Sequence, residues 1–209
     1  MIKIKICGIT NAEDALLCSG QGAHALGFIF SRKSPRSLSE KAALKIISSL
    51  DPFVAKVGVF VDEEKEKVLE IAGMLSLNIL QFHGKEPPAY CNFFRPKFKV
   101  IKVFFPHNRP FKETISRYAV DAYSFDIRYE DKLKGKNRLP KDILKEISSL
   151  IKQGYRVIIS GGLTVENVST ITKLKPYAVD VASGIEEFVG KKDKELVRLF
   201  IKKVKDAHT

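Results

Sequence analysis

Two titratable residues of the sequence, Cys7 and Asp126, each follow a short apolar run and could work as a base and an acid. Gly8 follows Cys7, so the sulfur can face a site in which basic neighbours lower its pKa and produce a thiolate base. Asp126 comes directly after Phe125, and a partly desolvated carboxyl group can donate a proton as a general acid. Each residue also has a structural interpretation, an inert buried thiol for Cys7 and a loop-capping carboxylate for Asp126.

Glycines near the C-terminus indicate a phosphate site. Gly161-Gly162 follows Ser160, and Ser183-Gly184 follows a later apolar run. Glycine allows the backbone to approach a phosphate oxygen closely, and backbone N–H groups then hold the anion. A Gly-Gly pair alone is more often a simple turn. Together, the two segments predict a phosphate cup formed by Gly161, Gly162, Ser183 and Gly184.

Four further polar residues are predicted to bind substrate: Arg36, Gln81, His83 and Asp180. The planar fork of Arg36, after Ser34-Pro35, suits a carboxylate ligand, although an ordinary surface arginine in a turn also fits. His83 could instead be a satisfied polar residue in a tight His-Gly turn. Asp180 lies inside an apolar run, where holding the architecture or orienting a neighbour is its alternative role.

Eight short runs rich in Val, Ile and Phe alternate with segments of helical spacing, which predicts parallel strands joined by crossover helices. The predicted strands are 2–6, 25–30, 56–61, 79–82, 100–104, 122–127, 156–160 and 178–183. This number of units in 209 residues predicts a single α/β domain over 1–209, a (β/α)8 TIM barrel, with a doubly wound open sheet as the alternative. In a barrel, the residues that follow the strands gather at one face, where the chemistry lies.

Helical spacing is clearest at 39–47, 141–151 and 194–204. Ser39 is expected to cap the first of these helices. The last is expected to pack on the barrel through an apolar stripe of Leu196, Leu199, Phe200 and Val204. Segment 62–67 mixes acidic residues with lysines and predicts a solvated helix face with opposite charges one turn apart.

The formal net charge of +12 is spread along the chain, with most lysines among glutamates. This pattern favours a lysine-rich solvated surface over a nucleic-acid site, with attraction of an anionic metabolite as the alternative. We therefore expect a small phosphorylated molecule as the partner, and no nucleic acid.

The cysteines Cys7, Cys18 and Cys91 are widely spaced and show no pattern typical of a metal or redox pair. They predict a reduced, cytoplasmic protein without a metal, in which Cys18 and Cys91 are structural. Residues 1–6 are too few and too charged for a signal sequence. No apolar run approaches the ~20 residues that cross a bilayer. Both a monomer and a homodimer are compatible with the sequence.

Taken together, these motifs resemble the phosphoribosylanthranilate isomerase family along nearly the whole chain. The segments that carry the resemblance occur in the family's order, at 5–10 (KICGIT), 27–30 (GFIF), 34–36 (SPR), 57–61 (VGVFV), 80–84 (LQFHG), 160–163 (SGGL) and 180–186 (DVASGIE).

The resemblance implies that Cys7 is the general base and Asp126 the general acid, that Arg36 meets the anthranilate carboxylate, and that the last two strand-end loops hold the phosphate. The implied reaction is the Amadori rearrangement of N-(5′-phosphoribosyl)anthranilate in tryptophan biosynthesis. It implies no metal and no organic cofactor, because the substrate's own nitrogen acts as the electron sink.

One segment departs from the family pattern. A glycine-rich loop is usual after the acid, whereas this chain has the charged segment 128–140. Such a loop would close over substrate and exclude water, so the change concerns the lid, the rate and the substrate range. Alternative functions are a related phosphosugar aminoaldose isomerase of broadened range, which would need a second phosphate grip, and a non-catalytic barrel that binds a phosphometabolite.

Overall fold

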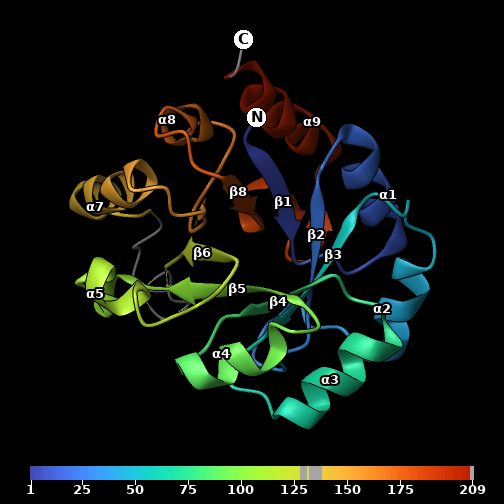
Figure 1. Cartoon of the computed structure of the whole chain (residues 1–209). Coiled ribbons are helices and arrows are strands. Elements are labelled where there is room, and N and C mark those ends of the chain that lie inside the picture. The colour runs from blue at the N-terminus through green and yellow to red at the C-terminus, as the bar shows by residue number, and fades with distance from the viewer. Residues whose placement is uncertain (128–130, 132–137, 208–209) are drawn as a thin grey trace.

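Eight parallel strands close into a barrel with helices around its outside (Figure 1). The computed structural model describes residues 1–127, 131 and 138–207. The eight predicted strands all form, with ends displaced by no more than two residues. In chain order, the elements are β1 Lys3–Cys7, α1 Ala12–Gln21, β2 Ala25–Ile29, α2 Glu40–Ile47, β3 Ala55–Phe60, α3 Lys65–Met74, β4 Ile79–Phe82, α4 Pro88–Phe94, β5 Lys99–Phe104, η1 Pro106–Asn108, α5 Phe111–Ile115, β6 Ala122–Phe125, α7 Lys141–Lys152, β7 Val157–Ile159, α8 Val168–Thr172, β8 Ala178–Val181, η2 Ser183–Ile185, β9 Glu186–Phe188, β10 Lys191–Lys192 and α9 Lys194–Asp206.

The barrel interior changes from apolar to polar along the strand direction. Side chains alternate along each strand, so Ile4 and Ile6 pack in the core shared with the helices while Lys5 and Cys7 face the interior. Near the amino ends of the strands, the interior holds a small apolar cluster of Ile79, Ile101, Ala122, Ile158 and Ala178. Two residues further along these strands lies a buried polar layer that includes Gln81, Ser124, Ser160 and Asp180. The sequence therefore places its polar interior at the end of the barrel where the predicted site lies.

Side-chain caps begin three of the described outer helices, α1, α2 and α9. The Ser39 side chain accepts a hydrogen bond from the Ala42 N–H, which confirms the predicted start of α2. Asp193 caps α9 by accepting from the Leu196 N–H at 2.7 Å. On α9, all four residues of the predicted apolar stripe pack against the core, and the structure adds Val197 and Ile201 to the buried side. The side chains that become fully buried are Val197, Phe200, Ile201 and Val204, whereas Leu196 and Leu199 are partly buried at its edge. Both sets fit helical spacing, and docking on the barrel selects between them.

The prediction of one helix face over 62–67 is wrong in its first half. Helix α3 begins at Lys65, and Asp62 has a left-handed backbone with φ of 51°. The Asp62 Oδ1 accepts a hydrogen bond from the Lys85 N–H. Aspartate tolerates this conformation and competes for backbone donors, so it lies in the strand-to-helix loop instead of starting the helix.

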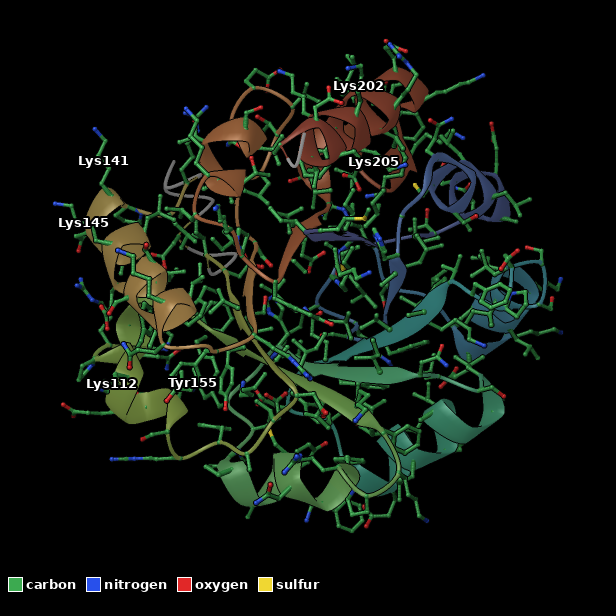
Figure 2. The ribbon with its side chains drawn as sticks, turned by 45° about the horizontal axis from the view of Figure 1, so that its top comes forward. Lys112, Lys141, Lys145, Tyr155, Lys202 and Lys205 are labelled. Carbon is green, nitrogen blue, oxygen red and sulfur yellow. The ribbon has the colours of Figure 1, made fainter. Side chains whose placement is uncertain are left out.

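The lysines are distributed over several helices, as predicted for a solvated surface. Lys112 on α5, Lys141 and Lys145 on α7, and Lys202 on α9 point away from the barrel (Figure 2). Within the described residues, none of the helices is both long enough and apolar enough to span a membrane.

Acid is expected to weaken the fold through His24, which precedes β2. Its Nδ1 accepts a hydrogen bond from the Ile4 N–H at 3.1 Å, and a protonated ring cannot do so. Burial, followed by Lys3 and Lys205, lowers the His24 pKa below its ordinary value of 6.5. Because the folded-state pKa is the lower one, the stabilisation is complete above about pH 6.5 and is lost as pH falls through the folded value.

Melting temperature measured by circular dichroism against pH checks this expectation. The His24→Asn variant keeps an oxygen that can accept the Ile4 N–H and does not titrate. We expect its melting temperature to fall less steeply than that of the wild type below about pH 6.5. Equal slopes would show that another group controls acid stability.

Candidate active site

One cavity at the carboxyl ends of the strands collects every residue that the sequence singled out. Its volume of about 720 Å³ is in the range of small-molecule sites. The predicted residues that line it are Cys7, Arg36, Gln81, His83, Asp126, Gly161, Gly162, Asp180, Ser183 and Gly184. They come together because parallel strands in a closed barrel all end at the same face.

Cys7 is the last residue of β1, and its side chain is 8% exposed at the wall of the cavity. Gly8 adopts φ of 72°, a conformation that favours glycine, as the chain leaves the strand. The pKa of the Cys7 thiol is raised above its ordinary value, because burial outweighs the Lys5 ammonium, the largest influence that lowers it. The expectation that basic neighbours lower this pKa overall is therefore wrong. The amount of thiolate therefore depends on the charges around the sulfur.

Asp126 comes directly after β6, and its two carboxylate oxygens have different neighbours. The Ile127 N–H donates to Oδ1 at 2.6 Å, and the His83 Nε2 lies 3.1 Å from Oδ2. A Cβ at position 161 would lie 2.9 Å from the Asp126 Oδ1, so Gly161 provides the space that the carboxyl group occupies. His83 is thus placed against the candidate acid instead of being paired within its own turn.

Arg36 is held by a carboxylate that the sequence did not single out as functional. Its Nε donates to the Glu186 Oε1 at 2.8 Å, and its Nη2 contacts the Glu186 Oε2. Burial raises the Glu186 pKa, but the Arg36 and Lys192 cations outweigh it and the net shift is downward. The fully buried Lys192 donates both to Glu186 at 2.8 Å and to the Cys7 carbonyl oxygen at 2.9 Å. This network connects Arg36 to the backbone of the candidate base.

Sequence reasoning assigned no role to Glu186 or Lys192, because they belong to a short hairpin, β9 and β10, inserted after β8. The pattern of eight strand–helix units gives no signal for this insertion. A different residue, Lys5, was detectable: strand alternation puts it on the same side as Cys7, two residues earlier.

The loops after β7 and β8 expose backbone donors to the cavity. Gly161 and Gly162 have φ values of 78° and 70°, which favour glycine. No group among the described residues accepts a hydrogen bond from either of their N–H groups. The Asn167 side chain fixes this loop by donating to the Gly162 carbonyl at 2.7 Å and accepting from the Thr164 N–H at 2.9 Å. Paired glycine N–H groups without protein acceptors are suited to an anion.

Two buried acceptor oxygens in the same cavity also have no partner among the described residues. They are the Gln81 Oε1 and the Asp180 Oδ1. The other carboxylate oxygen of Asp180 accepts from the Lys5 Nζ at 2.7 Å, and burial raises the Asp180 pKa. Buried acceptors of this kind are stabilised when a ligand hydroxyl or amine donates to them.

The departure of segment 128–140 from the family pattern falls mostly outside the described residues, which include only Asp131 and 138–140 of it. Within the described part of the chain, no three or more His, Cys, Asp and Glu side chains are grouped as a metal would require.

Comparisons with known proteins give the same family over nearly the whole chain. The family model described as N-(5′-phosphoribosyl)anthranilate (PRA) isomerase matches residues 4–203. The N-(5′-phosphoribosyl)anthranilate isomerase of Thermotoga maritima is 41% identical over 207 residues, which cover 98% of this chain and 99% of the relative.

Solved structures agree with the sequence comparison. Monomers described as generated from the dimeric phosphoribosylanthranilate isomerase of Thermotoga maritima superpose with a TM-score of 0.82 at 36% identity, covering 99% of this chain and 100% of that one. A phosphoribosylanthranilate isomerase bound to reduced 1-(o-carboxyphenylamino)-1-deoxyribulose 5-phosphate gives 0.82 at 38% identity with the same coverage. The chain belongs to the N-(5′-phosphoribosyl)anthranilate isomerase family.

Proposed function

We propose that this barrel, as one domain over 1–209, converts N-(5′-phosphoribosyl)anthranilate into 1-(2-carboxyphenylamino)-1-deoxyribulose 5-phosphate, a step of tryptophan biosynthesis. One observation carries the proposal: a buried thiol, a positioned carboxyl group, an arginine fork and two glycine loops share a single cavity. Together they match an aldose that bears a carboxylate at one end and a phosphate at the other.

Asp126 is the general acid and Cys7 the general base. Asp126 protonates the ring oxygen, the furanose opens, and the substrate nitrogen stabilises C1′ as an iminium ion. The Cys7 thiolate then removes the C2′ proton, and the resulting enol becomes the ketone of the product. The His83 and Ile127 contacts of Asp126 fix the carboxyl group in one orientation, which favours proton transfer to one atom of the substrate.

The remaining polar groups bind the substrate. Backbone N–H groups at Gly161, Gly162, Ser183 and Gly184 hold the phosphate, as the last two loops of such barrels commonly do. The guanidinium of Arg36, held by Glu186, binds the anthranilate carboxylate. Gln81 and Asp180 accept hydrogen bonds from sugar hydroxyls through their unpartnered oxygens, and His83 contacts the substrate beside the acid.

A coupled fluorescence assay tests the function. Phosphoribosylanthranilate is generated from anthranilate in the cuvette, and its disappearance is followed after the protein is added. Turnover by the wild type supports the proposal. If the wild type binds the reduced product analogue with a saturable signal but does not consume the substrate, the chain is a phosphometabolite-binding barrel and the proposal is wrong.

A homodimer is the assembly that we propose, formed through the face at the amino ends of the strands. Three exposed apolar side chains belong to this face: Met1 before β1, Phe53 before β3 and Tyr177 before β8. Phe53 is 95% exposed. A stable dimer buries about 800 Å² on each partner, usually with aromatic residues at its centre. The related enzyme of Thermotoga maritima, described as dimeric, supports this assembly.

Light scattering after size-exclusion chromatography checks the assembly. We expect the wild type to elute as a dimer and Phe53→Asp to elute as a monomer, because a buried carboxylate opposes the contact. The matched control, Phe188→Asp, changes an exposed phenylalanine of β9 beyond the opposite ends of the strands and is expected to remain dimeric. A monomeric wild type would reject the dimer.

We also propose that the protein works in the cytoplasm. Its three cysteines, Cys7, Cys18 and Cys91, are all free and buried, which suits a reducing compartment.

A further inference from the structure

Lys5 is a charged residue inside the barrel, directly below the candidate base. It lies two residues before Cys7 on β1, faces the interior, and is 3% exposed. In the parallel register of β1 and β8, Lys5 is paired with Asp180, and its Nζ lies 2.7 Å from the Asp180 Oδ2. Burying an ammonium group is costly unless its charge is compensated. Groups inside the barrel must therefore compensate the charge of Lys5.

Gly27 of β2 has no side chain, so the Lys5 ammonium and the Cys7 sulfur can both lie against its backbone. Cys7 is paired with Gly27 in the register of β1 and β2. A Cβ built on Gly27 would lie 2.7 Å from the Cys7 Sγ and 3.1 Å from the Lys5 Nζ. Both atoms therefore lie over the backbone of Gly27, and Lys5 faces two acidic groups, the Asp180 carboxyl and the Cys7 thiol.

We propose that Lys5 is a positioning residue that divides its positive charge between Asp180 and the Cys7 sulfur, and so sets how much of Cys7 is thiolate. The functional meaning of this inference rests on the proposed role of Cys7 as the base. Asp180 holds the ammonium in place but also competes for it, so that the thiol is not fully ionised.

The charges that surround Cys7 agree with this division. Burial raises the Cys7 pKa, Lys5 lowers it most strongly, and Asp180 raises it. Lys192 of β10 also acts on the sulfur and lowers the pKa. Asp126 and His83 in turn act on Asp180. Strand β2, the other neighbour of β1, has no titratable residue. Substitution of Lys5 therefore tests this division of charge most directly.

The pH dependence of Cys7 alkylation measures its ionisation without any catalytic step. Folded protein is treated briefly with iodoacetamide from about pH 6 to about pH 11, around the ordinary thiol pKa of about 8.5. Modification is quantified on the Cys7 peptide by mass spectrometry. Cys18 and Cys91, 0% and 1% exposed, serve as internal reporters of unfolding.

Two variants are expected to move the midpoint of alkylation in opposite directions. Lys5→Met should raise it by about one pH unit or more, so that alkylation below the midpoint is about tenfold slower. Asp180→Asn should lower it, because the ammonium then acts on the sulfur alone. The matched control, Lys3→Met, removes an exposed lysine from the same strand and should leave the midpoint unchanged.

Asp180→Asn keeps the inference falsifiable if Lys5→Met does not fold with an unpaired carboxylate inside the barrel. A midpoint that stays or rises in Asp180→Asn, or stays in a folded Lys5→Met, overturns the role of Lys5. The midpoint is read without substrate, so this outcome is separate from the proposed function. If the wild type turns over substrate but the alkylation midpoints of the variants do not move, only the role of Lys5 is rejected. If the midpoints move but the wild type shows no turnover, only the isomerase activity is rejected.

Discussion

Cys7→Ser and Asp126→Asn are each expected to lower kcat/KM by about 10³-fold to 10⁴-fold, the upper part of the range for general acid–base catalysis. A serine hydroxyl keeps the shape of the thiol but does not ionise near neutral pH, so the C2′ proton has no base. An asparagine keeps the hydrogen-bonding shape of Asp126 but has no proton to give to the ring oxygen. The coupled fluorescence assay measures both losses.

A neutral cysteine substitution provides the matched control. Cys18 lies in α1, is fully buried, and has a pKa raised by burial to about 12. Cys18→Ala should leave kcat/KM within about twofold of the wild type, since a protonated thiol in the core does no chemistry. The two site variants should still bind the reduced product analogue and melt near the wild-type temperature. Residual turnover within about tenfold of the wild type in Cys7→Ser would assign the base to another residue.

Gly184→Ala is expected to lower kcat/KM by about 100-fold, mainly through KM. A Cβ at this position would overlap the backbone carbonyl of Leu163, which cannot rotate aside as a flexible side chain can. The loops after β7 and β8 would have to separate, and the proposed phosphate cup would widen. A 100-fold loss corresponds to about 2.7 kcal/mol, the scale of a hydrogen bond to a charged group.

Gly20→Ala is the control for this substitution. Gly20 lies in α1, and a Cβ built there meets nothing within 4 Å. Alanine in a helix is more favourable than glycine by up to about 1 kcal/mol, so this variant should be at least as stable as the wild type and equally active. Kinetics with inorganic phosphate as a competitor complete the measurement, since Gly184→Ala should also weaken inhibition by phosphate. An unchanged KM in Gly184→Ala would place the phosphate elsewhere.

Local sequence patterns predicted the strands and the strand ends well, for a physical reason. Strands buried on both faces need continuous apolar runs, and such runs are visible without knowledge of contacts. Because all eight strands are parallel and the barrel is closed, any residue just after a strand must reach the same face. Cys7 and Asp126 could therefore be assigned to one cavity although they are 119 positions apart in the sequence.

Sequence patterns were less reliable where two different sets of residues satisfy the same helical spacing. On α9, Leu196 and Val197 are both compatible with an apolar stripe, and only contact with the barrel shows that Val197 is the fully buried one. At Asp62, a run of charges resembles a helix, whereas the left-handed backbone and the hydrogen bond from Lys85 put the residue in a loop. Periodicity constrains which residues share a face, but docking decides how that face is turned.

The sequence by itself determined the barrel, its eight strands and ten of the residues that line the cavity. Only the tertiary structure decided how the charges in that cavity are paired. Lys5 meets Asp180 because barrel closure aligns β1 with β8, and Arg36 meets Glu186 across 150 positions of the chain. Ion pairs depend on distances of a few ångströms between residues far apart in sequence, and composition and periodicity carry no information about such distances.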